Sequence, residues 1–551
     1  MYNHITEHIH ILRKLRINQT TELLTNKLKR KRGQLPIQQP HSLNLQTSLR
    51  LSFHIASFYI SSFIYLHNIE IITASFPGLV SQEQQGKKTN SPQPVQAQTN
   101  GIKTLLGDPK KAIITLSLPM IVAMTVQTLY NLINRIWVSG LGTEAAAAVG
   151  FAFPLLFMGT ALATGLGVGG GSAISRKIGA KDKNGGDNAA VHTLILMVIA
   201  ALAYAIPLFI FAEDIFRLIG AGEATKTAAL YAQIIYAASI IMFFTSIATA
   251  LLRSEGDAKR SMLAMILGGI LNVVLDPLFI YVFGWGVPGA AIASVISISV
   301  SAILLFYWLF LKKNTYLTIH FHGFHFDKQV IKDILTVGLP ASLLQLSMAI
   351  MLFIMNIIVE RIHGTDGVAV FSAGWSVAMT ASMPLLGMAT AVVSVCGATF
   401  GAKEYKKLDI AHLYALKIGI LIETAIAIAT FIFAPLITLA FTTSPDMVHL
   451  GDDITTFLRI ICIYYPATAF GMLSSSLFQG VGKGLYSLIV TILRTIILII
   501  PLAWLFGITL GWGLPGAWWG LVIANIIGSA VTFIWAKLYV NTLLSTTPTT
   551  V

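Results

Sequence analysis

A carboxylate stands in the middle of an apolar stretch of the chain, and its chemistry needs explaining first. The stretch spans roughly residues 261–283, and Asp276 lies within its motif NVVLDPLFIY. An ionised group at the depth of a membrane costs about 2.5 to 3.5 kcal/mol on insertion scales. Such groups usually face a cavity and take part in binding or transport. Asp276 is therefore the first candidate for a cation-binding residue.

Two neighbours in the sequence support this interpretation. Asn272 precedes Asp276 by one helical turn, so both side chains fall on one face of a helix. Pro277 follows directly and removes a backbone donor, which tends to kink a helix. A kink beside a carboxylate creates a bending point that can respond to protonation. The alternative is a buried aspartate held permanently by hydrogen bonds from Asn272 and its neighbours.

Two further polar residues lie in neighbouring apolar segments and can reach the same cavity. They are Tyr231, in the fourth apolar segment counted below, and Ser294, in the sixth. Each of them, taken alone, is also compatible with ordinary packing or a helix–helix hydrogen bond.

The composition places these residues in a membrane protein. Of 551 residues, 55% are hydrophobic and only 11% are charged, whereas soluble domains have about 25% charged residues. The mean hydropathy is +0.74. The net charge of +13 is then attributed to loops that orient the chain in the bilayer, and not to nucleic-acid binding. The two cysteines have no metal-ligand spacing, and no nucleophile–base set appears, so neither a cofactor nor an enzyme is predicted.

The elements that position the candidate residues are long apolar segments, too long and too continuous for barrel strands. In a bilayer each must satisfy its own backbone groups, so each is predicted to be a helix. The twelve segments are approximately 112–138, 147–173, 190–212, 226–251, 261–283, 288–311, 331–359, 368–396, 411–440, 453–477, 485–507 and 516–539.

The loops predict the orientation of these helices. Basic residues gather in the loops after the even-numbered segments, for example Arg176 and Lys177 after the second and Lys403 after the eighth. The odd-numbered loops carry mainly acids. Positive residues are retained in the cytoplasm. The sequence therefore predicts a multi-pass protein of the cell membrane, with both ends of the helical unit in the cytoplasm.

The helical unit repeats itself once. Short motifs recur at a spacing of about 222 to 227 residues: Leu118-Pro119 and Leu339-Pro340, Gly179-Ala180-Lys181 and Gly401-Ala402-Lys403, and Trp285–Ala290 and Trp512–Ala517. Six helices repeated once give two halves of the same orientation, an architecture typical of transporters with a substrate site between the halves. The predicted division is an N-lobe over 101–311, a linker over 312–330, a C-lobe over 331–543 and a tail over 544–551.

The first hundred residues differ from the rest. They are basic near the start, and residues 51–80 are only moderately apolar. Residues 81–100 are rich in glutamine and proline and are predicted to be a linker. We interpret residues 1–100 as a poorly ordered extension or as the result of a start codon placed too early. An additional membrane-associated helix is the other interpretation.

Further charged residues lie deep in the second half. Glu423, Arg459 and Arg494 fall inside apolar segments, and two roles are open for them: ion pairs between helices, or the lining of a cavity in the C-lobe. Methionines in the same half offer an adaptable surface for varied ligands, although plain packing is the alternative. The predicted substrate cleft comprises Gln127, Met351, Met355 and Met383. In the linker, His320, His322 and His325 are interpreted as part of a flexible solvated segment and not as a metal site.

Taken together, several motifs give a resemblance to a known family. From about Leu106 to Leu543 the chain resembles the multidrug and toxic compound extrusion (MATE) transporters, most closely their prokaryotic DNA-damage-inducible subfamily. The motifs are LLGDPKKAI (105–113), LPMIVAMTVQTLYNLINRIWVSGLGT (118–143), LLRSEGDAK (251–259), NVVLDPLFIY (272–281), GWGVPGAAIAS (284–294) and GWGLPGAWW (511–519).

The resemblance implies two six-helix bundles around a V-shaped cleft, and export of amphipathic, often cationic compounds in exchange for protons or sodium ions. It also implies a cation site in the N-lobe formed by Asn272, Asp276, Tyr231 and Ser294. In the first helix the family pattern is Tyr-Asn-x-x-Asp, and this chain has Asn134 at the aspartate position. An amide cannot take up a proton or carry charge. Cation coupling is then expected to depend on Asp276 alone.

We therefore predict a monomeric secondary exporter of drug-like small molecules, embedded in the lipid bilayer and coupled to H⁺ or Na⁺. A flippase for lipid-linked oligosaccharides, from the same broad superfamily, is the alternative. It predicts a large hydrophilic cavity with basic residues for pyrophosphate. A membrane sensor or scaffold without transport is a third class, and no appended soluble domain is predicted to support it.

Overall fold

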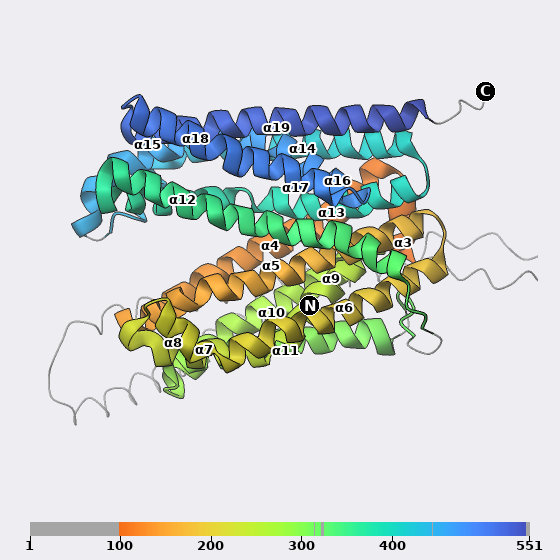
Figure 1. Ribbon diagram of the computed structural model, residues 1–551, viewed down its shortest axis with the longest axis horizontal. Coiled ribbons are helices and arrows are strands. Elements are labelled where there is room, and N and C mark those ends of the chain that lie inside the picture. The colour runs from red at the N-terminus through yellow and green to blue at the C-terminus, as the bar shows by residue number, and fades with distance from the viewer. Residues whose placement is uncertain (1–98, 313, 321–323, 444, 547–551) are drawn as a thin grey trace, which may run out of the picture. The chain divides into compact units, whose positions relative to one another are not determined.

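The computed structural model describes residues 99–546, except for 313, 321–323 and 444. The predictions for residues 1–98 and for the last part of the tail lie outside the described residues. The regular elements in the described part are all helical. They form two bundles that lie side by side and are joined by an irregular segment after residue 311 (Figure 1).

The first bundle contains the elements of the predicted N-lobe. They are α3 (Asn100–Leu106), α4 (Pro109–Ser139), α5 (Thr143–Gly179), α6 (Lys183–Ile210), α7 (Ala212–Leu218), η2 (Gly222–Ala224), α8 (Thr225–Ala237), α9 (Ser239–Ser254), α10 (Ala258–Pro277), η3 (Leu278–Val282), α11 (Gly286–Phe306) and η4 (Tyr307–Leu311). Of these, η3 and η4 are π-helical turns.

The second bundle contains the elements of the predicted C-lobe. They are α12 (Lys328–Ala381), α13 (Met383–Gly401), α14 (Tyr405–Leu439), η5 (Pro445–Leu450), α15 (Gly451–Ile461), α16 (Tyr464–Gly480), α17 (Gly484–Ile492), η6 (Leu493–Leu498), α18 (Ile499–Trp504), η7 (Leu505–Thr509) and α19 (Gly513–Ser545). Here η6 and η7 are π-helical.

The number of membrane-spanning helices agrees with the sequence. Ten helices in the described part are long and apolar enough to cross a membrane, and two bent pairs raise the number to as many as twelve. The helix α12 covers the seventh predicted segment and the first part of the eighth, which continues in α13, with non-helical backbone at His363 and Gly364 between the two segments. Gly364 has φ of 60°, a conformation that glycine adopts without steric cost. The prediction of an all-helical twelve-span protein is confirmed.

The bent pairs occupy equivalent places in the two bundles. α8 and α9 meet at 52°, and α15 and α16 meet at 49°. Pro466 explains the second bend, since a proline cannot donate to the carbonyl four residues earlier, here that of Cys462, directly after the end of α15 at Ile461. The bend at Ala238 has no proline at the matching position. The repeat in the sequence is thus also a repeat of helix breaks.

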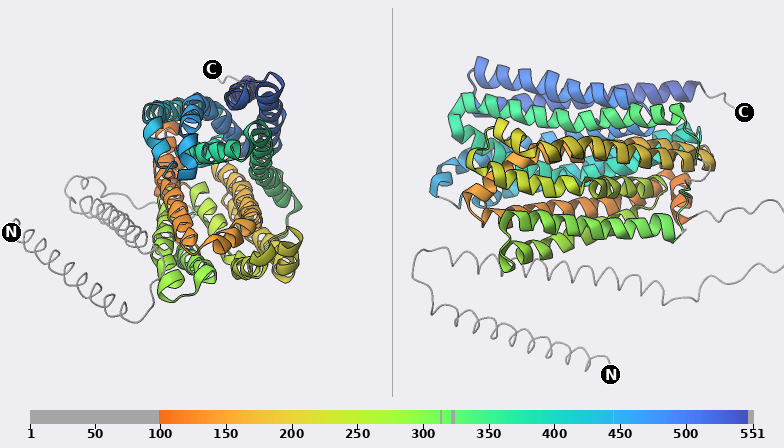
Figure 2. Two further views of the ribbon diagram at one scale, coloured as in Figure 1. Left: turned by 90° about the vertical axis from the view of Figure 1, so that its left-hand side faces the viewer. Right: turned by 60° about the horizontal axis from the view of Figure 1, so that its bottom comes forward.

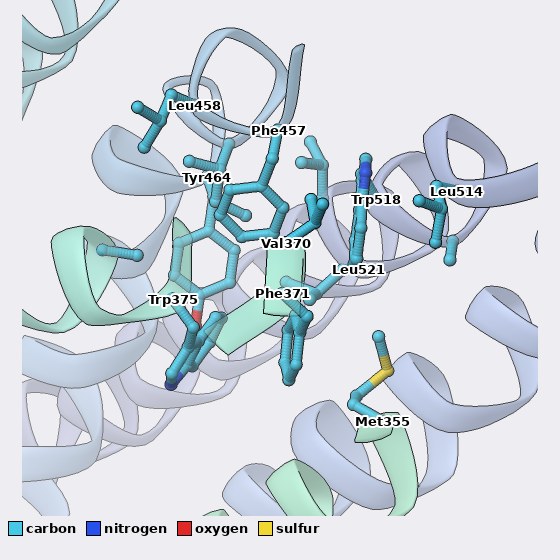
Figure 3. Close-up of a cluster of buried hydrophobic side chains, with 14 of the residues drawn as sticks. Met355, Val370, Phe371, Trp375, Phe457, Leu458, Tyr464, Leu514, Trp518 and Leu521 are labelled. Atoms are coloured by element: carbon cyan, nitrogen blue, oxygen red, sulfur yellow. The ribbon is translucent and has the colours of Figure 1, made fainter. Parts of the chain in front are cut away.

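Aromatic side chains fill the core of the second bundle (Figure 3). The rings of Phe371 and Trp518 are stacked with centroids 5.7 Å apart, and Phe457 meets Trp518 edge-on at 4.7 Å. Met355 packs in the same cluster and is fully buried. Aromatic pairs of this kind stabilise beyond their buried area by about 0.5–1.5 kcal/mol. The core thus holds α12, α15 and α19 together.

The two bundles touch through small residues at one end, here called the closed end. A Cβ added to Gly401 would overlap the backbone of Arg176, and one added to Gly179 would overlap the backbone of Ala398. Nearby, Ser172 Oγ donates to the carbonyl oxygens of Gln479 at 2.5 Å and Gly480 at 3.0 Å. Small residues allow such close helix contacts in membranes. The ribbons of the two bundles converge at this end and diverge toward the other (Figure 1). The left view of Figure 2 looks along the helices and shows the blue helices of the second bundle above the orange-to-green helices of the first.

Part of the segment between the bundles is bound to the first bundle. The backbone N–H groups of Tyr316 and Leu317 donate to Glu255 Oε2 at 2.9 and 3.1 Å. The N–H of Thr318 donates to Asp187 at 2.9 Å. These three residues are therefore attached to the first bundle, because buried and half-buried carboxylates supply acceptors that periodicity in the sequence does not reveal.

Candidate cation-coupling site

The predicted residues on α10 and α11 lie together inside the first bundle. Asn272 Nδ2 donates to Asp276 Oδ1 at 3.1 Å and to Ser294 Oγ of α11 at 3.2 Å. Asp276 is fully buried and Asn272 is 5% exposed. One amide group therefore orients the carboxylate and ties α10 to α11.

Pro277 shapes the backbone at this point. α10 ends at Pro277, and the chain continues through the π-helical turn η3. π-helical turns often occur at functional sites, because the wider turn changes the direction of side chains. Within η3, Tyr281 turns toward α4 and its hydroxyl donates to the carbonyl of Trp137 at 2.5 Å. The kink expected from the sequence is thus a change of helix type.

α4 and α10 are held together on both sides of Asp276. At one end is the hydrogen bond from Tyr281 to Trp137. At the other, a Cβ on Gly269 would lie 3.0 Å from the ring of Tyr130. Asn134 follows Tyr130 by one helical turn and precedes Trp137 by three residues, so it lies on the same face of α4. This register places Asn134 at the level of Asn272 and Asp276.

Two tyrosines complete the surroundings of the carboxylate. Tyr231 of α8 is 8% exposed, and both Tyr231 and Tyr130 interact electrostatically with Asp276. Tyr231 is one of the predicted site residues. Tyr130 is not, although its position one turn before Asn134 on the same helix face is a signal that the sequence already contained.

The site is rich in buried acceptors that have no hydrogen-bond donor within the described residues. They are Asn134 Oδ1, Asn272 Oδ1 and Asp276 Oδ2. A buried acceptor without a donor costs about 1–3 kcal/mol, and more when it is charged. A proton on the carboxylate or a monovalent cation among these oxygens would remove that cost. The arrangement is therefore chemically suited to bind and release a cation.

The predicted substrate residues divide into two groups. Gln127 and Met383 are half-buried, and the side chain of Gln127 hydrogen-bonds to Tyr130 beside the cation site. Met351 and Met355 are fully buried in the aromatic core of the second bundle. In this conformation the latter two pack as core side chains, because α12 turns that face toward α15 and α19.

The charged residues in the second half form no ion pairs in the part of the chain that the structure describes. Arg459 lies over the ring of Phe431, 5.7 Å from its centroid. Arg494 is 7% exposed, and its Nη1 has no hydrogen-bond partner. Glu423 is fully buried, and neither of its oxygens has a partner. The interpretation as ion pairs between helices is wrong for these residues in this conformation.

Glu255, between α9 and α10, gives a testable pH dependence. It is 2% exposed, and burial raises its pKa from 4.5 to about 8 against the opposing effect of two backbone N–H donors. Because the folded-state pKa is the higher one, this contribution to stability is complete below pH 4.5 and is lost as the pH rises through about 8. We expect the free energy of unfolding to decrease across this window, by an amount on the order of a few kcal/mol. The thermal unfolding temperature should fall accordingly.

The Glu255→Gln variant should lose this pH dependence while remaining folded, since the amide does not titrate. Glu404→Gln is a matched control. Glu404 also lies at the closed end, but in the C-lobe and in a half-exposed ion pair with Lys407. An unchanged pH dependence in Glu255→Gln would show that Glu255 does not cause it.

Comparison with known proteins agrees with this geometry. The MatE family model matches residues 119–278 and 340–505. The multidrug export protein MepA of Staphylococcus aureus (strain MSSA476) is 26% identical over 75% of this chain and 90% of its own length. MepA of Staphylococcus saprophyticus is 27% identical over 76% of this chain and 91% of its own.

Solved structures are more similar still. A crystal structure of a MATE protein in complex with MaL6 is 46% identical and covers 81% of this chain and 100% of its own, with a TM-score of 0.80. A transporter of the MOP superfamily from Pyrococcus furiosus Vc1 is also 46% identical, over 82% and 100%, with the same TM-score. With its two matched halves, its spanning helices and these relatives, this chain belongs to the MatE family, the multidrug and toxic compound extrusion transporters.

Proposed function

We propose that this protein is a secondary active exporter that exchanges protons or sodium ions for amphipathic, often cationic small molecules. The observation that carries the proposal is the fully buried Asp276, one oxygen of which has no donor among residues 99–546 as described, beside the amide oxygens of Asn134 and Asn272, which also have none there. Relatives named as multidrug export proteins support the substrate class.

Cation binding at Asp276 would act on the packing of α4 against α10. An empty carboxylate is charged and poorly solvated, so it favours a conformation that admits water or a donor. A bound proton or sodium ion removes this cost. It thereby stabilises the close packing of α4 against α10 between two contacts, Tyr130 with Gly269 and Tyr281 with Trp137. A ligand shifts a conformational equilibrium only through such differential affinity. The π-helical turn after Pro277 is the flexible point of this step.

The closed end is proposed to face the cytoplasm. Arg176, Lys177, Lys181 and Lys403 all lie at this end, and positive residues are retained on the cytoplasmic side. The structure then corresponds to the outward-facing state of an alternating-access cycle, with the lobes joined at the cytoplasmic end. Asp276, Asn272, Tyr231, Ser294 and Asn134 are the residues proposed to couple this cycle to the cation.

Efflux from vesicles tests the function directly. The purified protein is reconstituted into lipid vesicles, and the vesicles are loaded with a cationic dye. A proton gradient or a sodium gradient is then imposed across the vesicle membrane in separate samples. We expect dye movement that depends on one of the two gradients. If neither gradient drives dye movement, while a lipid-linked oligosaccharide is translocated, the exporter proposal is wrong and the flippase alternative is correct.

Restoring a second carboxylate should change the coupling. In Asn134→Asp, two acidic groups would face each other across α4 and α10, and the site would bind more positive charge. We expect more cations exchanged per substrate, measured as a change in the membrane potential at which net dye flux stops. Asn131→Asp is the matched control, because the Asn131 side chain on the same helix is exposed whereas that of Asn134 is half-buried. Equal stoichiometry in Asn134→Asp and Asn131→Asp would contradict the assignment of Asn134.

A further inference from the structure

The C-lobe contains a buried acidic residue that is not part of the proposed cation site in the N-lobe. Glu423 lies in the membrane-spanning helix α14 and is fully buried. Both of its oxygens lack hydrogen-bond partners within the described residues. An ionised carboxylate without any partner in an apolar interior is far more costly than a neutral one. The surroundings of Glu423 in this conformation therefore suit the protonated form.

One buried hydroxyl on a neighbouring helix interacts with it. Tyr465 of α16 is fully buried, its hydroxyl lies near the side chain of Thr430 on α14, and it interacts electrostatically with Cys462 and with Glu423. Other ionisable groups on α14 and the helices packed around it interact elsewhere: His412 with Ser474, Cys462 Sγ with the Leu458 carbonyl, Arg459 with Phe431, Arg494 with Tyr464, Tyr130 with Asp276, Lys110 with Tyr414, and Lys537 with Asp409. Lys417 of α14 is exposed. Tyr465 is thus the ionisable group of these helices that interacts with Glu423.

The pair lies where two helices of the C-lobe are interrupted. A Cβ on Gly419, one turn before Glu423, would contact Leu385 and Leu473. Since α14 runs antiparallel to α13, the next turn of α14 faces the start of α13, where Ser382 separates it from α12. On α16, Tyr465 follows the 49° bend at Cys462–Ile463. A change in either bend would alter the surroundings of Glu423.

The pair is not a copy of the Asp276 site. The repeat aligns Pro277 with Pro501, so Ile500 stands where Asp276 stands in the first half. The motif GAK at 179–181 and 401–403 aligns Glu423 with Ala201. Each lobe therefore carries a buried carboxylate at a position where the other has an apolar residue.

We propose that Glu423 and Tyr465 form a second proton-binding site, specific to the C-lobe. The proton sits on Glu423 in this conformation and leaves to water when the helix bends rearrange, and the Tyr465 hydroxyl then donates to the carboxylate. A metal ion is a poor fit, because hard cations need several oxygen ligands, and the described residues contain no group of three or more His, Cys, Asp or Glu side chains that could hold one. The role of the Glu423 site in transport rests on the proposed function, whereas proton binding at this site does not.

Infrared spectroscopy of the purified protein, recorded against pH, tests the site without any transport measurement. We expect Glu423→Gln to lose one band of a protonated carboxylic acid that is present in the native protein, and Asp276→Asn not to lose that band. Glu423→Asp keeps an acid and should retain a band at an altered frequency. Tyr465→Phe should shift the pH at which the Glu423 band disappears, whereas Tyr464→Phe, its immediate neighbour, should leave that pH unchanged.

Two results would overturn the proposal. One is an unchanged carboxylic-acid spectrum in a Glu423→Gln protein whose thermal unfolding matches the native protein. The other is a Glu423 band whose pH dependence is the same in Tyr465→Phe and Tyr464→Phe. These results are separate from the exporter function: vesicles without gradient-driven efflux but with the expected bands would refute the function and keep the site.

Discussion

Replacing Asp276 by asparagine is expected to reduce export driven by an ion gradient at least several-fold. Asparagine preserves the shape of the side chain but cannot bind a proton or neutralise a cation. The energetic difference between the cation-bound and cation-free states at this site should then vanish. Typical coupling free energies of about 1–3 kcal/mol correspond to 5- to 150-fold effects. We therefore expect the rate of gradient-driven dye efflux to decrease by a factor within this range or larger, and the affinity for the dye to change little.

The measurement is dye efflux from vesicles under the gradient that drives the native protein, paired with equilibrium dye binding. Asp214→Asn is the matched control, because Asp214 lies on α7 in an exposed ion pair with Arg217. The assignment of Asp276 fails if its asparagine variant retains native ion-coupled export, or if Asp214→Asn loses export to the same extent.

Replacing Gly401 by alanine is expected to open the closed end. An added Cβ would overlap the backbone of Arg176 in the opposite lobe, so the lobes must separate or the helices shift. Overpacking of this kind costs about 1–3 kcal/mol. Because 1.4 kcal/mol is tenfold in an equilibrium, the population of the closed arrangement should fall by roughly 5- to 150-fold. Within an isolated helix, alanine would instead be stabilising by about 0.5–1 kcal/mol.

Spin labels placed on Lys259 and Lys406 report the separation of the lobes. Both residues are exposed and lie at the starts of α10 and α14, one in each lobe at the closed end. We expect a longer and broader distance distribution in Gly401→Ala. Gly171→Ala is the matched control, since its Cβ would make ordinary contacts at 3.5 Å or more inside the N-lobe. Identical distributions in both variants would show that the glycine contact does not hold the lobes together.

The sequence predicts the local part of the candidate site well. Asn272 and Asp276 are one turn apart, so a helix of any kind places them on one face. Pro277 predicts a disturbance of the backbone, although not that it would be the π-helical turn η3. Ser294 and Tyr231 could be named as site residues only through the resemblance to the family. Their position beside Asp276 depends on how α8 and α11 pack against α10.

The remaining features depend on contacts between elements far apart in the chain. The hydrogen bond from Tyr281 to Trp137 and the contact of Gly269 with Tyr130 join α4 to α10 across more than a hundred residues. The linker residues 316–318 contain no signal for the carboxylates that bind them. From the sequence alone, Met351 and Met355 could line a cleft or pack in a core. The packing of α12 places both in the core of the second bundle.

By itself the sequence determined the membrane class, the twelve spans, the repeat and the pairing of Asn272 with Asp276. These follow from hydrophobicity, from loop charges and from the helical period, all of which act within one segment. Tertiary structure alone decided which polar atoms are left without partners. In the part of the chain that the structure describes, Asp276 Oδ2 and both oxygens of Glu423 have no hydrogen-bond donor, because the neighbouring helices place none within reach. Hydrogen-bond satisfaction is a property of the whole packing, and a single segment cannot reveal it.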